Sequence, residues 1–248
     1  MVRMESPSEN PGHAATATQP PPSQTLSRGI RALEILAAAD RPLTIAELTQ
    51  ALGVHRSVAY RILRTLEDHS LLVRDDAGRV QPGPGLAVLA SGVSRSLQTA
   101  ALPELTQLAN SLHMTAFVAV WDHQECVTLV TVEPRHTGSA LAQHPGTRHP
   151  VSTGAPGIAI QSTMTEERWQ QVAAGIPYRP EARRAHQLGY ATSHDEVIAG
   201  LSSVAAPITV PGGRPAAIAV VYIRLEQDAD AVGQALAASA ARIEGQLL

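Results

Sequence analysis

Residues 44–66, TIAELTQALGVHRSVAYRILRTL, decide how the first part of the chain folds. Thr44, followed three residues later by Glu47, forms a capping box, in which each side chain accepts a hydrogen bond from a backbone N–H that a helix start leaves unpaired. The apolar spacing that follows predicts a helix over residues 45–52. Gly53 then supplies the left-handed residue that ends such a helix and lets the chain turn within about three or four residues.

A further helix is predicted from His55 to Asp68, and its two sides differ in character. One side carries apolar residues at helical spacing, which predicts packing against the preceding helices. These residues are Val54, Val58, Ile62, Leu63 and Leu66. Residues 53–66 hold three arginines and no acid, so the other side offers hydrogen-bond donors to phosphates and to the edges of guanine or adenine. The residues expected to contact DNA from this helix are His55, Arg56, Ser57, Tyr60, Arg61 and Arg64.

The segments on either side complete the pattern of a winged helix-turn-helix. Before it, apolar residues over 26–37 recur at steps of three and four and predict a first helix. After it, residues 71–74 and 79–81 flank the turn sequence DDAG and predict a short hairpin, the wing. Arg74 and Arg79 of this wing are expected to touch flanking phosphates or the minor groove.

The composition changes along the chain and indicates its domains. Residues 1–24 are rich in Pro, Ser, Thr and Ala without periodicity, so they bury too little apolar surface to offset the entropy of ordering and are expected to be a disordered tail. We expect a DNA-binding domain over 25–85, a helical linker over 86–102 and a second domain over 103–248. Pro103 is expected to start a further helix after the linker.

The second domain mixes strands and helices. Residues 117–121 and 126–132 are β-prone runs around a polar turn, and they predict a hairpin. A second strand pair is predicted at 204–210 and 216–223, on either side of the turn sequence PGGR. Helices are predicted near 165–174, 180–188 and 228–247. Because strands and helices do not alternate as βαβ units, the fold class expected for the two-domain chain is α+β.

The composition also limits the classes of protein. With 248 residues, 44% of them hydrophobic and 17% charged, and a mean hydropathy of −0.02, the chain fits a soluble globular protein. It shows neither an apolar run of about 20 residues nor a secretory signal, so we expect a cytoplasmic protein without membrane contact. A net charge of −3 would usually argue against nucleic acid as a partner, but the location of the arginines matters more than the total.

Catalytic and metal sites find little support in the sequence. The ten histidines lack the spacing of a zinc site, and surface or loop positions explain them better. Those that invite the question most are His136, His144, His149, His186 and His194. Cys126 lies in an apolar strand pattern typical of a buried, inert thiol, and one cysteine excludes an internal disulfide framework. With no nucleophile elbow or phosphate loop, we expect no catalytic residue, no metal and no cofactor.

Three stretches of the sequence resemble a known protein family. The run over 27–90, SRGIRALEILAAADRPLTIAELTQALGVHRSVAYRILRTLEDHSLLVRDDAGRVQPGPGLAVLA, resembles the winged helix-turn-helix of the IclR family of bacterial transcription regulators. Residues 145–159, PGTRHPVSTGAPGIA, and 188–208, LGYATSHDEVIAGLSSVAAPI, look like that family's effector-binding domain, a GAF-like α+β module. The resemblance implies a homodimer or dimer of dimers that binds a pseudo-palindromic double-stranded operator and responds to a small organic acid or related metabolite.

The resemblance also implies roles for single positions. Arg56, Ser57 and Arg61 match family positions that contact DNA. Gly154 and Ala155 match a small-residue turn that lines the effector pocket. The remaining effector-binding positions that it implies are Ser193, Leu201 and Ser203.

Three positions depart from the family pattern. Family members usually carry His at the position of Ser152, Lys at that of Ile158 and frequently Cys at that of Ser203. These departures favour an effector that is larger or less acidic than the family's usual one.

Two classes of function remain open. The first is a ligand-responsive transcription regulator, expected to be a repressor controlled by a small organic metabolite. The second is a small-molecule-binding or hydrolytic domain that its N-terminal helices merely dimerise. An acid-free arginine face contributes nothing to a dimer seam, which needs an apolar stripe, so the sequence favours the first.

Overall fold

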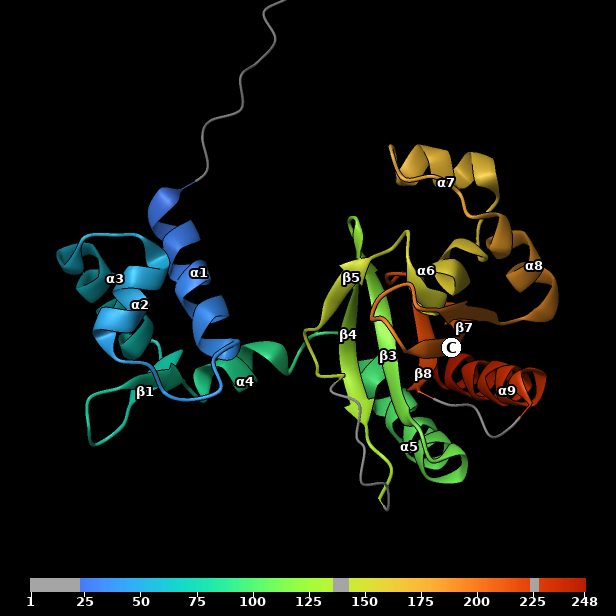
Figure 1. Cartoon of the computed structure of the whole chain (residues 1–248), viewed down its shortest axis with the longest axis horizontal. Helices are drawn as coiled ribbons and strands as arrows, with labels where there is room; N and C mark the ends of the chain where they lie inside the picture. The colour runs from blue at the N-terminus through green and yellow to red at the C-terminus, as the bar shows by residue number, and fades with distance from the viewer. Residues whose placement is uncertain (1–22, 136–142, 224–227) are drawn as a thin grey trace, which may run out of the picture. The chain divides into compact units, whose positions relative to one another are not determined.

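The computed structural model describes residues 23–135, 143–223 and 228–248 of the chain. The chain divides into a first unit, residues 1–92, and a second unit, residues 93–248, each of which is described by itself (Figure 1). The predicted tail over 1–24 lies outside the described residues except at its end. There Ser23 caps a helix through its side chain, and Gln24 is the first residue of that helix.

The first unit contains the predicted helices and hairpin. The three helices are α1 (Gln24–Ala37), α2 (Ile45–Leu52) and α3 (Arg56–Asp68). The antiparallel hairpin consists of β1 (Leu72–Arg74) and β2 (Val80–Pro82), so the winged helix-turn-helix pattern is confirmed.

The turn between α2 and α3 forms as the sequence predicts. The backbone N–H of Thr44 donates to Oε2 of Glu47 at 2.7 Å, and the N–H of Glu47 donates to Oγ1 of Thr44 at 3.2 Å, which completes the capping box. Gly53 ends α2 in the left-handed conformation with φ of 63°. Behind this turn, Leu48 and Leu63 are fully buried in the small core of the unit.

The connection between the units differs from the prediction. Instead of one continuous helical pattern, α4 (Gly85–Ala90) and α5 (Arg95–Leu112) are separated by a turn in which Ser94 has φ of 44°. The expectation that Pro103 starts a helix is wrong, because Pro103 lies inside α5. The helix continues through it because the α5 face that includes Leu105 is buried in the core, and packing outweighs one missing backbone hydrogen bond.

The second unit is built on one antiparallel sheet with the strand order β5-β4-β3-β8-β7-β6. Both predicted strand pairs are confirmed and form its middle: β3 (Thr115–Asp122) with β4 (Glu125–Val132), and β7 (Ser202–Ile208) with β8 (Ala216–Tyr222). The edge strands, which the sequence did not reveal, are β5 (Arg148–Pro150) and β6 (Ala191–His194). Together with its helices, this sheet confirms the α+β class.

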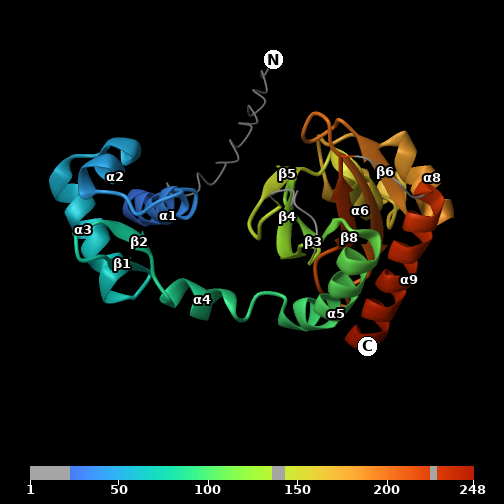
Figure 2. The same ribbon diagram turned by 60° about the horizontal axis from the view of Figure 1, so that its bottom comes forward.

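Helices cover both faces of the sheet (Figure 2). The long helices α5 and α9 (Ala229–Leu247) lie side by side on one face, against alternate residues such as Val118. Helix α6 (Gly154–Gln161) packs on the other face, where Phe117 points. The remaining helices of this unit are α7 (Glu166–Val172) and α8 (Pro180–Leu188). Within the described residues, no helix is long and apolar enough to cross a membrane.

Both tryptophans of the chain belong to the second unit and stack on each other. The ring centroids of Trp121, on β3, and Trp169, on α7, are 4.9 Å apart with an interplanar angle of 27°. Trp169 is fully buried, and its Nε1–H donates to the carbonyl of Ile176 at 2.9 Å. Tryptophan fluorescence therefore reports on this unit alone.

Helix α6 lies very close to the chain that precedes it. All eight of its residues are buried, and a Cβ added at Gly157 would lie 2.2 Å from the carbonyl oxygen of Val151. Only a residue without a side chain fits there. This contact fixes the place of α6, and of Gly154 at its start, against the segment that follows β5.

Gly157→Ala is therefore expected to lower the free energy of unfolding of the second unit by about 1–3 kcal/mol, the usual cost of overpacking. Urea unfolding followed by tryptophan fluorescence measures this change. Gly245→Ala in α9 is the control, because a Cβ there meets nothing within 4 Å and replacing a helical Gly by Ala typically gains about 0.5–1 kcal/mol. Equal unfolding midpoints for wild type and Gly157→Ala would contradict this close contact.

Candidate functional site

The outer face of α3 carries the six residues predicted to contact DNA, and all six are exposed. His55 caps the helix: its Nδ1 accepts the backbone N–H of Ser57 at 3.4 Å and lies 2.9 Å from Oγ of the same serine. The guanidinium of Arg56 donates to the hydroxyl of Tyr60 at 3.1 Å and lies 5.4 Å from the centroid of the Tyr60 ring. Four of the six side chains thus form two local pairs along the first turns of the helix.

Arg61 and Arg64 are different. Within the part of the chain that the structure describes, neither guanidinium makes a hydrogen bond or an ion pair. Both lie on the exposed side of α3, away from the buried Ile62 and Leu63. Two uncompensated guanidinium groups on one helix face can bind phosphates or base edges without first breaking a contact.

The wing arginines are held by carboxylates of their own unit. Nε of Arg74 donates to both carboxylate oxygens of Glu67 at 3.0 and 3.2 Å, and Nη2 of Arg74 donates to Oε2 of Glu67 at 3.1 Å. These hydrogen bonds raise the pKa of Arg74. Nε of Arg79 donates to Asp75 at 2.7 Å, and the backbone N–H of Arg79 lowers the pKa of the Asp75 carboxyl. The sequence pattern does not reveal these partners, because Glu67 lies just outside the acid-free window and Asp75 belongs to the predicted turn.

A cavity of about 310 Å³ opens in the second unit beside the start of α6. It brings together four of the five predicted effector-binding residues: Gly154, Ser193, Leu201 and Ser203. Other residues in its wall include Phe117, His149, Pro156, Glu196, Val197, Ile198 and Val221. Most of this wall is apolar, which is the usual character of a small-molecule pocket.

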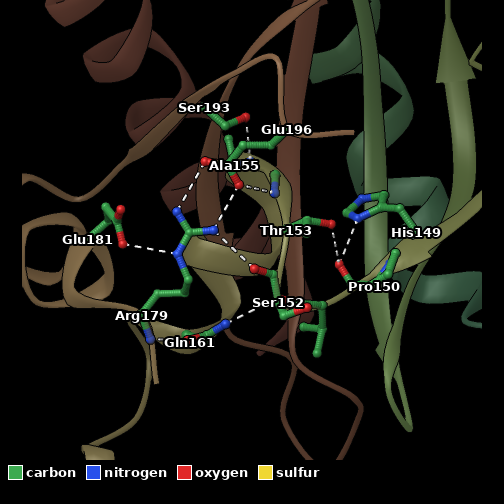
Figure 3. Close-up of polar contacts among 12 residues, drawn as sticks. His149, Pro150, Ser152, Thr153, Ala155, Gln161, Arg179, Glu181, Ser193 and Glu196 are labelled. Atoms are coloured by element: carbon green, nitrogen blue, oxygen red, sulfur yellow. Dashed lines mark hydrogen bonds and ion pairs between the residues drawn. The ribbon is translucent and has the colours of Figure 1, made fainter. Parts of the chain in front are cut away.

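Ala155 does not line the cavity. Its side chain is fully buried in the core, and its backbone N–H donates to Oγ of Ser193 at 2.9 Å (Figure 3). Gly154 and Ala155 form the first turn of α6 rather than an isolated turn, and Gly154 takes φ of 79°. The hydroxyl of Ser203 donates to the carbonyl of Val220 at 2.9 Å. Both predicted serines therefore already hold one backbone hydrogen bond.

Arg179 and Glu196 form an ion pair at the edge of the cavity that sequence reasoning missed (Figure 3). Nη1 and Nη2 of Arg179 donate to the two oxygens of Glu196 at 2.8 and 3.1 Å. Nη1 also donates to the carbonyl of Ser152 at 3.0 Å, and Nε donates to Glu181 at 3.0 Å. Glu196 accepts in addition the backbone N–H of Gly154 at 2.9 Å, and Arg179 lowers the pKa of its carboxyl. Arg179 and Glu196 are 17 positions apart, and neither helical nor strand periodicity relates residues at that separation, so the sequence does not predict this pair.

His149 contributes an imidazole to the cavity wall. It is buried, its Nδ1 lies 3.1 Å from the carbonyl oxygen of Pro150, and burial lowers its pKa. The ring is therefore neutral near pH 7, with the proton on Nδ1 and an acceptor at Nε2.

The described part of the chain brings no three His, Cys, Asp or Glu side chains into a metal-binding group, and His136 lies outside it. Cys126 is buried, which raises the pKa of its thiol to about 12.

Ser202, His194 and Asp195 are arranged in the order of a hydrolase catalytic triad. Oγ of Ser202 lies 2.7 Å from Nδ1 of His194, whose Nε2 lies 3.0 Å from Asp195. Because the side chain of Asp195 is 50% exposed, the array lacks the buried acid that orients a catalytic histidine.

The model of the IclR helix-turn-helix domain matches residues 25–76, which include α1, α2, α3 and the start of the wing. A curated relative, the probable transcriptional regulator SauR of Cupriavidus necator, is 29% identical over 215 residues, which cover 79% of this chain and 84% of that protein. The name of this relative describes a regulator and no enzymatic activity.

Solved structures are similar over nearly the whole chain. An IclR transcriptional regulator from Alicyclobacillus acidocaldarius superposes with a TM-score of 0.75 at 25% identity, covering 92% of this chain and 100% of that one. An IclR homologue from Microbacterium hydrocarbonoxydans, solved in complex with 4-hydroxybenzoate, has a TM-score of 0.75 at 24% identity and covers 90% of this chain and 98% of that one. The first unit therefore carries an IclR-type helix-turn-helix domain, and the chain is similar over most of its length to transcription regulators of the IclR family.

Proposed function

We propose that the protein binds double-stranded operator DNA as a homodimer or dimer of dimers, and that a small molecule in the cavity of the second unit controls this binding. The observation that carries the DNA half is the exposed face of α3, where Arg61 and Arg64 have no carboxylate partner among the described residues. In helix-turn-helix proteins, the N-terminal residues of the recognition helix contact base edges. Here that end of α3 is basic, while its acids, Glu67 and Asp68, close the other end.

Two-fold symmetry sets the geometry of the operator. A dimer presents two copies of α3 to half-sites about one helical turn apart, roughly 34 Å. An effector changes affinity only if it binds one placement of the two helix-turn-helix units better than another. A displacement of a few ångströms takes one recognition helix out of its groove, so a small change at the cavity is sufficient.

The effector half of the proposal rests on the cavity. Its volume and its apolar wall with a few converging polar groups suit a small organic molecule. The 4-hydroxybenzoate complex of the Microbacterium homologue supports a small-molecule site in this fold.

We further propose that the protein acts in the cytoplasm and that it controls transcription by repression. A protein bound over a promoter keeps RNA polymerase off that DNA by occupying the same space. Transcription from the promoter beside the protein's own gene, with and without the protein in a purified system, measures this. Higher transcription in its presence would show activation instead.

Arg61→Ala is expected to abolish specific operator binding and to leave the fold intact. A bidentate Arg contact to guanine contributes about 1–3 kcal/mol of base discrimination, and each protomer of a dimer loses it. A mobility shift with the promoter DNA beside its own gene, at two salt concentrations, gives the affinity. Arg31→Ala is the control, because Arg31 lies on α1 and is paired with Glu34 at 3.0 Å. Unchanged affinity and base preference in Arg61→Ala would contradict this role.

Arg74→Ala is expected to weaken binding to all DNA sequences alike. The loss removes a phosphate contact and leaves Glu67 as an unpaired negative charge beside the DNA, and the log–log salt slope should shrink by about one unit. The double variant Glu67→Ala/Arg74→Ala should recover part of the affinity, because it removes that charge as well. A loss confined to one base position would show instead that the wing reads sequence.

Ser203→Phe is expected to block the effector response and to spare DNA binding, because the new ring fills the cavity. A thermal-shift screen of metabolites on the wild type identifies a compound that raises the melting temperature, and the variant should lose that shift. Thr192→Phe is the control, since Thr192 is an exposed residue of the edge strand β6. Equal shifts in both variants would place the effector site elsewhere, and no shift with any metabolite would contradict small-molecule control.

A further inference from the structure

We propose that the cavity selects an uncharged, mainly apolar molecule that carries a hydrogen-bond donor, and that Glu196 is the residue that excludes carboxylates. This inference rests on the proposed function, in which the cavity holds the effector. It departs from the organic acid that the family resemblance implies.

The charge in the cavity wall is negative. Among the described residues that line the cavity, Glu196 is the only one with a formal charge at neutral pH, and no Arg lines it. The rest of the wall is largely made of apolar side chains such as Phe117, Leu201 and Val221. An apolar ligand of matching shape loses water contacts there without losing hydrogen bonds.

Arg179 is placed near the cavity edge, but its charge is already engaged. All three guanidinium nitrogens donate: Nη1 and Nη2 to Glu196, Nη1 also to Ser152, and Nε to Glu181. One guanidinium therefore faces two carboxylates, and the three groups together carry a net charge of −1. An incoming carboxylate would have to displace Glu196 to reach this arginine.

The start of α6 offers no free backbone donor in its first turn. The N–H of Gly154 donates to Glu196 at 2.9 Å and that of Ala155 donates to Ser193 at 2.9 Å. The next residue, Pro156, has no N–H. The N–H groups that would bind an anion at a helix start are thus occupied or missing.

The remaining polar groups of the wall mainly accept hydrogen bonds. His149 leaves Nε2 as an acceptor, because its Nδ1 faces the carbonyl of Pro150. Ser203 donates its hydrogen to Val220, so only its lone pairs stay available. Ser193, which accepts from Ala155, keeps one hydrogen to donate. Gln143 and Ser202 also line the cavity, and Nε2 of Gln143 already donates one hydrogen to Thr128 at 2.7 Å. A hydroxyl or N–H on the ligand therefore finds several acceptors here, whereas a carboxylate, which only accepts, finds few donors and the like charge of Glu196.

A thiol placed in the cavity tests the charge preference directly. Ser203→Cys is nearly isosteric, and iodoacetamide and iodoacetate are reagents of similar size that differ in charge. The ratio of their alkylation rates cancels the ionisation of the thiol, which is common to both. Ser111→Cys, at an exposed position on α5, supplies the reference ratio, and the buried native Cys126 contributes little background.

We expect the ratio of iodoacetamide to iodoacetate rates at Ser203→Cys to exceed the ratio at Ser111→Cys by at least about tenfold, which corresponds to about 1.4 kcal/mol. A ratio equal to or below the reference overturns the proposal. Tryptophan fluorescence of Trp121 and Trp169 checks the fold of each variant. If Ser203→Cys does not fold, Ala199→Cys, which also lines the cavity, gives the same readout.

Adding Glu196→Gln to Ser203→Cys should bring the ratio down to the reference or below, because Arg179 then loses its cavity-side carboxylate. Glu181→Gln is the matched control: it removes the other carboxylate of Arg179, which does not line the cavity, and should leave the ratio high. Equal effects of the two substitutions overturn the assignment to Glu196. They would show that the total charge of the cluster governs access.

This experiment uses neither DNA nor effector, so its result is independent of the proposed function. A high ratio combined with no ligand in the thermal-shift screen refutes small-molecule control and leaves the charge selection standing. A tight carboxylate ligand whose binding Ser203→Phe abolishes refutes the charge selection and leaves the proposed function standing.

Discussion

The close approach of α6 to the sheet is the constraint on which the second unit depends. The sheet face beneath this helix carries Ala119, Ala205, Ala217 and Ala219, whose small side chains leave room for a helix backbone. Gly157 permits the final approach to the Val151 carbonyl. Because aromatic residues make up only 3% of the chain, close packing of small residues replaces the bulk of large rings. The cavity opens where this packing stops, at the first residue of α6.

The sequence predicted the first unit well because its signals are local. A capping box, a left-handed glycine and an acid-free helix side each involve residues within a few positions of one another, and the structure places them as expected. Helix α6 was not predicted because all eight of its residues are buried, so its sequence has no amphipathic period. The edge strands β5 and β6, with three and four residues, are too short to give a pattern.

The candidate site in the second unit could be predicted only in part, for a physical reason. Ser193, Leu201 and Ser203 lie within one continuous segment that resembles the family. The contacts that set the charge of the cavity join Glu196 to Arg179 and to a backbone N–H 42 residues away. Such contacts depend on the tertiary fold, and a glutamate followed by Val and Ile carries no sign of them.

The stack of Trp121 on Trp169 gives this protein an optical property of its own. Two indoles at 4.9 Å couple their electronic transitions, and coupled chromophores produce a paired positive and negative band in circular dichroism. The signal exists only while α7 stays against β3, whereas the helical signal comes from the whole chain. The first unit contains no tryptophan, so once the circular dichroism of the DNA itself is subtracted, a change in this band on adding DNA shows that the change reaches the second unit. Communication between the units can therefore be watched in solution without any label.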